Sequence, residues 1–281
     1  MPGVFVVTDS SCDLEQDDIA PFNVEIVPLT IRFGGEEFTD RLDLSTEDFY
    51  RRMSNSTDLP QTACPSPGAF EQAFRNASDA GAEAVVCLNI SSDLSTTLQS
   101  ARTAAEACAI PVHVIDSRTV SSGLGTLVVE AAKTAAGGAD VGAVLRRVSD
   151  LIPRTHVLAA LNTLENLKKG GRIGGATAMV GSLLSIKPVI DLSGGVVHEA
   201  GKARTRKRAL QMLYERLCAA GPIEDVAVMH GGAPDIDRFL DVIAPRLPRE
   251  AIRIGTLGAV VGVHGGPQMI GVSWIAAAQG I

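Results

Sequence analysis

Hydroxyl side chains at two places in this chain have the chemistry to bind an anion such as a carboxylate. Thr62 precedes the proline-rich turn at residues 64–67, and Ser91 and Ser92 follow an apolar run where a strand is expected to give way to a helix. The free N–H groups and the positive dipole end of a helix start suit an anionic head group. Serine and threonine also cap helices without binding any ligand, so both interpretations stay open.

Two histidines are further candidates. His264 lies between glycines at residues 262–267, where small neighbours let a ligand approach the imidazole closely. A neutral imidazole N–H can donate to a carboxylate, and a protonated ring pairs with it. The alternative is a histidine that packs at a strand end and hydrogen-bonds to the backbone. His230, which precedes Gly231 and Gly232, allows the same two interpretations.

Arg172 stands in the run KKGGRIGG at residues 168–175, between a short helical pattern and a second apolar helix pattern that closes on Lys187 and Pro188. Glycine pairs free the backbone for conformations that other residues avoid. Arg172 is then expected on a loop, where its fork of N–H donors can meet an anion. An ordinary helix end with a solvated arginine is the alternative.

A basic cluster, GKARTRKR at residues 201–208, stands out because the whole chain is acidic. It contains Arg204 and Arg206. Such a run is commonly the solvated face of a helix, and its contrast with the overall charge makes it a candidate docking patch for a phosphorylated ligand or an acidic partner.

Several familiar sites are missing from the sequence. There is no GxxxxGK[ST] phosphate loop and no GxSxG nucleophile elbow, and Gly123-Leu124-Gly125 lacks the third glycine of a dinucleotide fingerprint. The histidines are scattered, and no HExxH or clustered His/Asp pattern offers a metal site. We therefore expect no metal site and no phosphate-loop or dinucleotide site of these types in this chain.

Composition narrows the class of protein. The 281 residues carry a formal charge of −7, which argues against general binding to nucleic acid. Hydrophobic residues make up 46% and aromatic residues 4%, so the interior is aliphatic. The five cysteines form no CxxC pair, and neither a signal peptide nor an apolar run of the roughly 18 residues that span a bilayer is seen. We expect a cytoplasmic protein with reduced thiols.

Apolar runs alternate with helical patterns, which predicts a parallel sheet covered on both faces. Ligands of such sheets bind beyond the carboxyl ends of the strands, where Ser91, Ser92, Ser117, Ser121 and Ser122 are expected. The predicted strands are 4–8, 24–33, 84–90 and 112–116, and the predicted helices are 45–52, 67–80, 95–109, 126–136 and 141–151. A hairpin of 189–191 with 196–199, helices 202–220 and 234–244, and strands 225–230, 252–255 and 274–278 follow. The change in character places a domain boundary near residue 152.

Five segments resemble motifs of the DegV family of fatty-acid-binding proteins, which includes the FakB subunits of bacterial fatty acid kinase. They are TDSSCDL (8–14), TACPSP (62–67), ISSDLS (90–95), VIDSR (114–118) and LKKGGRI (167–173). GKARTRKRAL (201–210) and GVHGGP (262–267) agree with the family as well. The motifs occur in the expected order over residues 8–267, so the resemblance covers essentially the whole chain. Each motif is weak alone, and the ordered set is strong.

The resemblance implies an α/β fold of two domains with a long-chain fatty acid between them. Residues 1–152 would form a three-layer α/β/α domain with a parallel sheet, and residues 153–281 an α/β domain with a mixed sheet. By motif, Thr62, Ser92 and His264 should hold the carboxylate, with Ser91 and Arg172 nearby at the mouth. Arg204 and Arg206 should meet the partner or a phosphate group.

The same resemblance implies a carrier and not an enzyme, with no catalytic residues and no cofactor of its own. An ATP-dependent fatty acid kinase subunit would supply the chemistry, and a transient membrane contact is compatible with lipid exchange. The alternative is a phosphotransferase subunit similar to the substrate-binding part of dihydroxyacetone kinases, in which His264 or His230 would bond covalently to a small ketone. Thr96, Leu98 and Cys64 depart from the family pattern, which bears on tail preference and loop geometry.

Overall fold

The first sheet is parallel, and its strands are apolar enough to be buried on both faces. The computed structural model describes residues 3–56, 58–179 and 186–278. The strand order is β2-β1-β6-β7, and every residue of β6 is buried, as expected for a sheet with helices on both sides. The strands are β1 (Val4–Asp9), β2 (Val24–Val27), β6 (Ala84–Asn89) and β7 (Val112–Asp116).

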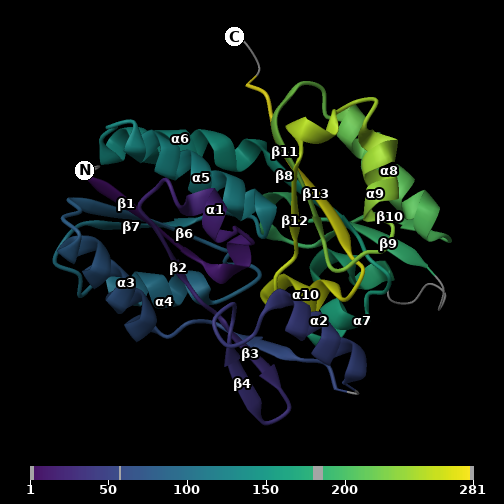
Figure 1. The fold of residues 1–281 in the computed structure, drawn as a ribbon, viewed down its shortest axis with the longest axis horizontal. Helices are drawn as coiled ribbons and strands as arrows, with labels where there is room; N and C mark the ends of the chain where they lie inside the picture. The colour runs from purple at the N-terminus through teal and green to yellow at the C-terminus, as the bar shows by residue number, and fades with distance from the viewer. Residues whose placement is uncertain (1–2, 57, 180–185, 279–281) are drawn as a thin grey trace.

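Two pairs of helices cover this sheet, which makes the first domain three-layered (Figure 1). Alternate strand residues define the two faces: Val85 and Cys87 pack with one pair of helices, and Val86 and Leu88 pack with the other. The first pair is α3 (Pro67–Asp79) and α4 (Thr97–Ala105), and the second is α5 (Ser122–Ala136) and α6 (Val141–Leu151). The short helix α1 (Gln16–Ile19) precedes β2.

The second sheet is mixed and has the order β10-β9-β8-β13-β11-β12, in which only the β11–β12 pair is parallel among the described strands. Its strands are β8 (Thr155–Ala160), β9 (Lys187–Asp191), β10 (His198–Ala203), β11 (Ile223–His230), β12 (Arg253–Thr256) and β13 (Ile270–Ala276). Helices α8 (Arg206–Ala219) and α9 (Ile236–Ile243) cover its outer face, packing against Leu158, Val189 and Val228.

A small antiparallel sheet of order β4-β3-β5 lies below both domains in the view of Figure 1. It consists of β3 (Thr30–Phe33), β4 (Glu36–Thr39) and β5 (Gln61–Ala63). Three helices gather beside it: α2 (Thr46–Asn55), α7 (Glu165–Lys169) and α10 (Ala259–Gly265). Helix α10 contacts α2, α7, β3 and β5, so it is held between the small sheet and the second domain.

The two domains share one core. Helix α5 contacts β1 and β6 on one side and β8, β11 and β13 on the other. Residues of both domains, such as Leu124 and Leu127 of α5 with Val157 and Met229 of the mixed sheet, belong to a single buried cluster. Because this interface is large and apolar, the domains pack as one unit.

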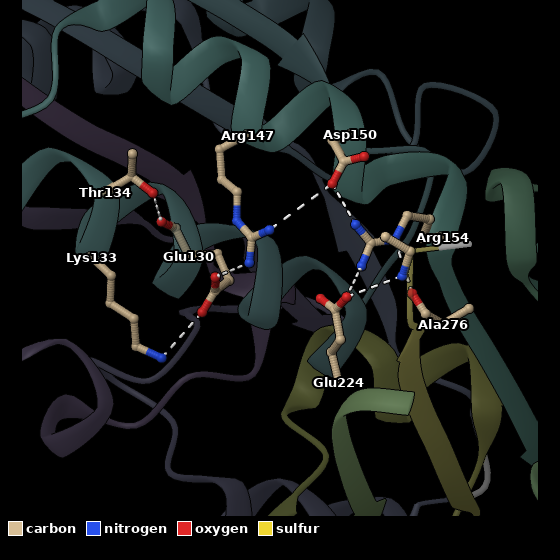
Figure 2. A network of polar contacts seen from close by, with 9 residues as sticks. Glu130, Lys133, Thr134, Arg147, Asp150, Arg154, Glu224 and Ala276 are labelled. Carbon is tan, nitrogen blue, oxygen red and sulfur yellow. Dashed lines mark hydrogen bonds and ion pairs between the residues drawn. The ribbon is translucent and has the colours of Figure 1, made fainter. Parts of the chain in front are cut away.

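A polar network closes the interface at the end where α6 leads into β8 (Figure 2). Arg154 donates through Nε to the carbonyl of Ala276 at 2.9 Å and pairs with Glu224 at 2.5 Å and with Asp150. Arg147 extends the network from Asp150 to Glu130 of α5, at 2.6 Å from the glutamate. The segment between the two domains is therefore hydrogen-bonded, through Arg154, to β13, the last strand of the second domain.

The expected fold class is confirmed, with several differences in its elements. The run 24–33 is not one strand, because Pro28 separates β2 in the parallel sheet from β3 in the small sheet. The helix expected at 202–220 begins only at Arg206, since Thr205 caps it by accepting from Arg208 N at 3.2 Å. Residues 201–203 instead complete β10, paired with β9.

Other helix and strand ends also differ from the predicted ones. Helix α5 begins four residues earlier than expected, α4 is shorter at both ends, and β13 begins at Ile270. The second apolar helix pattern of the glycine-rich segment falls partly on residues 180–185, which lie outside the described residues, and Lys187 and Pro188 begin β9. The boundary near residue 152 stays a prediction. Across the part of the chain that is described, every helix is too short or too polar to cross a lipid bilayer.

Candidate functional site

An apolar cavity lies between the two domains, beyond the carboxyl ends of the parallel strands. About 90 Å³ of it can hold the centre of a water-sized sphere, and the empty space among its lining atoms, which includes open solvent, is about 820 Å³. Leu29, Ile90 and Val120 line it from the segments that follow β2, β6 and β7. This is the edge at which sheets of this kind bind ligands. Ser121 and Ser122, which were expected there, do line the cavity.

The floor of the cavity comes from the inner face of the mixed sheet. Ile190, Ala159, Gly271 and Met229 stand in register across β9, β8, β13 and β11, and all four line the cavity. Because the two central residues are the smallest, the row is lowest in the middle, over β8 and β13. The space available there is lined by apolar residues, which suits an aliphatic chain.

Polar side chains are few along this cavity. Among the described residues that line it, those with polar side chains are Thr62, Ser95, Ser121, Ser122, Arg172 and His264. A small polyhydroxylated ligand needs many hydrogen-bond partners, whereas an acyl chain needs none along its length. The lining therefore favours a ligand that is apolar except at one end.

Thr62 and His264 meet at one end of the cavity, although 202 residues separate them in sequence. Thr62 Oγ1 lies 3.0 Å from His264 Nε2. Strand β5 carries the threonine, and the last turn of α10 carries the histidine. The imidazole packs against Gly170, where a Cβ would lie 2.5 Å from Nδ1. The glycine at 170 is thus required for the ring to occupy this place.

The surroundings of His264 keep its ring neutral. Burial, reinforced by the positive charge of Arg172, lowers the pKa of His264 to about 4. Nδ1 is buried and has no hydrogen-bond partner among the described residues. An unpaired buried N–H costs more than an unpaired lone pair, so the proton belongs on Nε2, where it can be donated to Thr62 Oγ1. The threonine hydroxyl is then free to donate to an anion.

Arg172 lies at the same end of the cavity. Its Nε donates to the carbonyl of Leu94 at 3.1 Å, and its Nη1 donates to the carbonyl of Gly170 at 2.7 Å. The guanidinium therefore bridges the second domain and the loop after β6. Its charge makes the surroundings of His264 favourable for an anion.

A polar groove begins where the apolar cavity ends. Thr62, Arg172 and His264 line both spaces. Arg32, Gln61, Asn166 and Lys169 line the groove further out. The three shared residues thus form a border between an apolar interior and an open, polar exterior, which is where the head group of an amphipathic ligand belongs.

The serines of the segment ISSDLS take other places than expected. Ser92 is exposed, and its Oγ donates to Asp116 Oδ2 at 2.5 Å, so the structure does not bring it to Thr62 and His264. Ser91 is buried and donates to the carbonyl of Gly195 at 2.9 Å, joining the two domains. Both hydroxyls are used because the turn after β6 points them at neighbouring chain segments. Ser95, which sequence reasoning had not singled out, lines the cavity instead.

Neither Arg204 nor Arg206 lines the cavity, and the two side chains have different surroundings. Arg204 is exposed. Arg206 is only 20% exposed and forms a two-pronged ion pair with Asp235, with both N–O distances 3.0 Å. Thr205 turns the chain into a helix, which brings Arg206 back over the start of α9. Arg206 is therefore held in an ion pair with Asp235, whereas Arg204 is exposed to solvent.

The described residues contain no cluster of His, Cys, Asp or Glu with the arrangement of a metal site. A family model described as "Uncharacterised protein, DegV family" matches residues 4–277. The chain belongs to the DegV family. A DegV domain-containing protein of Deinococcus radiodurans is 34% identical, over 96% of this chain and 97% of the relative. One from Streptomyces coelicolor is 32% identical, over 96% and 97%.

Solved structures of DegV proteins have the same two-domain fold. A structure described as fatty-acid binding of a DegV family protein from Thermus thermophilus has a TM-score of 0.89 at 33% identity, with 98% of this chain and 99% of that protein covered. A protein from Eubacterium ventriosum, described as binding stearic acid, has a TM-score of 0.87 at 26% identity, with 96% and 97% covered. This chain is thus similar over its whole length to a DegV family protein and to a second protein that are both described as binding fatty acids.

Proposed function

We propose that this chain binds a long-chain fatty acid, with the acyl tail in the interdomain cavity and the carboxylate at Thr62 and His264. The observation that carries the proposal is the border formed by Thr62, Arg172 and His264 between an apolar cavity and a polar groove. The proposal is supported by a DegV family protein at 33% identity and by a protein at 26% identity, both of which are described as binding fatty acids.

The energetics fit such a ligand. Each buried methylene contributes about 0.8 kcal/mol, so a chain of about sixteen carbons offers on the order of 10 kcal/mol before ordering costs. Burying a carboxylate without donors is expensive. The Thr62 hydroxyl, which accepts from the neutral His264 ring and is free to donate to the carboxylate, can offset that cost, and the charge of Arg172 favours the ionised form.

We also propose that this protein presents the head group to a partner kinase and does not itself transfer a phosphoryl group. A carboxylate at the border would face the polar groove, where a second protein can reach it. Arg204 is exposed and carries a charge that suits an acidic partner surface. Holding the carboxylate by the Thr62 hydroxyl that His264 orients, with no direct ion pair, would leave it free to react.

Lipid extraction tests the binding proposal. Purified protein is denatured, and its extract is examined by mass spectrometry for fatty acids, while delipidated protein is titrated with stearate. We expect a fatty acid in the extract and saturable uptake of one stearate per chain. Absence of lipid from repeated preparations, together with no uptake on titration, would refute the proposal.

Presentation to a kinase has its own test. The stearate-loaded protein is incubated with ATP and an ATP-dependent kinase subunit from the same organism, and acyl phosphate is trapped with hydroxylamine. Hydroxamate should form only when both proteins are present. Hydroxamate formed by this chain alone would show that it is an enzyme, and none in the complete mixture would leave fatty-acid binding as its function.

A further inference from the structure

The carboxylate of Asp13 lies where both domains and the small sheet meet. Asp13 follows the 3-10 turn Ser10–Cys12 in the left-handed conformation, with φ 52°, and its side chain is 0% exposed. Oδ2 accepts from Ser121 Oγ at 2.6 Å, and Oδ1 accepts from Gly258 N at 3.0 Å. Arg41 Nη2 lies 3.9 Å from Oδ1. Three separate parts of the chain thus converge on one carboxylate.

The contact with Gly258 fixes the start of α10, the helix whose last turn carries His264. Gly258 caps that helix, and a Cβ on it would lie 2.7 Å from Asp13 Oδ1. The close approach therefore requires glycine. The first N–H groups of a helix have no partner within the helix, and a carboxylate there is stabilised by the helix dipole. Asp13 anchors α10 in this way.

Arg41 joins the same carboxylate to the small sheet, which carries Thr62. Arg41 follows β4 closely, and its Nη1 donates to the carbonyl of Leu14, next to Asp13. Strand β3 pairs with β4 on one side and with β5, the strand of Thr62, on the other. Asp13 thus contacts the start of α10, the helix that carries His264, and, through Arg41, the small sheet that carries Thr62.

We propose that Asp13 is a positioning residue for the head-group site. It fixes the position of α10 relative to the small sheet and so sets the contact between Thr62 and His264. Tyr50 donates to the carbonyl of Leu257 at 3.1 Å, just before α10, and Asn166 donates to the carbonyl of Val263 at 2.9 Å, within α10. Among the described residues, only Asp13 joins the helix start to both the first domain and Arg41. The effect on fatty-acid affinity rests on the proposed function, whereas the effect on His264 does not.

The substitution Asp13→Asn tests this inference, because it keeps the shape of the side chain and removes its charge and one acceptor. In the ligand-free protein, we expect the ¹⁵N signals of the His264 ring to shift as its contact with Thr62 changes. The affinity for stearate should fall by up to about tenfold, because a displaced Thr62 hydroxyl would donate less well to the carboxylate, and full loss of one hydrogen bond to a charged group costs about that much.

Two control variants separate positioning from a general loss of stability. Asp140→Asn makes the same chemical change at the start of α6, where the carboxylate accepts from Ala143 N at 2.7 Å. Val228→Ala weakens the core on the outer face of the mixed sheet. Both should leave the His264 signals and the affinity unchanged while the protein is folded. Unchanged signals in Asp13→Asn, or equal shifts in Val228→Ala, would overturn the proposal.

Gly258→Ala provides a second route if Asp13→Asn does not fold. The added Cβ displaces the Asp13 carboxylate and leaves its charge in place, so the His264 signals should shift again; unaltered signals in the folded variant would count against the inference. Failure of the proposed function is distinguishable from failure of this inference. If the wild-type protein takes up no stearate, the function is wrong, but the His264 signals still decide whether Asp13 positions the ring.

Discussion

At the scale of single residues, the candidate head-group site uses a hydroxyl and a neutral imidazole instead of a direct ion pair. A buried ion pair needs excellent geometry to repay the desolvation of both charges. Thr62 and His264 avoid that cost on the protein side, while Arg172 supplies a positive potential and uses its own N–H groups on carbonyl oxygens. Such a site can bind a carboxylate and still release it.

Thr62→Val should weaken fatty-acid binding with little change in fold. Valine has a similar shape but no hydroxyl, so a bound carboxylate loses a donor, and the affinity for stearate should fall by about tenfold. Competition with a fluorescent fatty acid measures the change. Thr134→Val is the matched control, because Thr134 donates to the carbonyl of Glu130 within α5, away from the cavity. Equal affinities for the two variants would show that Thr62 does not hold the head group.

His264 should make the stability of the protein depend on pH. Burial and the charge of Arg172 lower its pKa to about 4, whereas an unfolded histidine titrates near 6.5. Between these values the unfolded chain binds more protons, so the contribution of His264 is complete above pH 6.5 and is lost as the pH falls towards 4. It amounts to at most about 3 kcal/mol.

Urea unfolding of the wild-type protein and of His264→Gln, from pH 7.5 to pH 5, measures this contribution. The difference in free energy of unfolding between the two should shrink as the pH falls, because only the wild-type protein loses the contribution of His264. Titration of other buried groups, such as Asp13, cancels in the comparison. A difference that stays constant over this range would contradict the lowered pKa.

At the scale of elements, the sequence predicted those whose signals are local. Ser66, Pro67 and the apolar spacing that follows predict α3, and Asp140 with its amphipathic pattern predicts α6; both helices were found at the expected places. Strands β4 and β5 were not predicted, because they are short and partly exposed and are stabilised by pairing with β3, which no local pattern reports.

The candidate site was predictable in part for the same reason. Thr62 and His264 stand in recognisable motifs, yet only the tertiary fold brings them to 3.0 Å from one another. The segment ISSDLS offers three hydroxyls with equal claims in sequence. The turn after β6 decides among them, pointing Ser92 at Asp116 and leaving Ser95 at the cavity.

The basic run at residues 201–208 should divide into structural and free charges. Burial alone would raise the pKa of Asp235, but its contacts with Arg206 outweigh burial and lower it. Arg206→Met should therefore reduce the free energy of unfolding by about 1–3 kcal/mol, since it leaves a half-buried carboxylate without its partner. Arg204→Met, at an exposed position, should change it by less than about 0.5 kcal/mol. Chemical denaturation of both variants checks this, and equal losses would contradict the division.

At the scale of the whole molecule, the cavity lies within the core that unites the two domains. The ion-pair network around Arg154 ties them at one end of the interface (Figure 2), and contacts such as Ser91 with Gly195 and Asp13 with Gly258 tie them elsewhere. A ligand in the cavity would touch both domains at once. Binding of stearate should then stabilise the whole fold, by about 2.7 kcal/mol at a hundredfold excess over Kd.

Gly271→Val tests whether this interdomain space is where the acyl chain lies. A Cβ at Gly271 meets the carbonyl oxygen of Leu158 at 3.6 Å, an ordinary contact, so the backbone accepts a side chain there. The rest of the valine projects over the low middle of the cavity floor and narrows the space. Gly35→Val places the same side chain on a surface turn, where a Cβ meets nothing within 4 Å. Stearate uptake and its thermal stabilisation should be lost in Gly271→Val and kept in Gly35→Val, with both proteins folded by circular dichroism. Normal uptake by a folded Gly271→Val protein would place the acyl chain elsewhere.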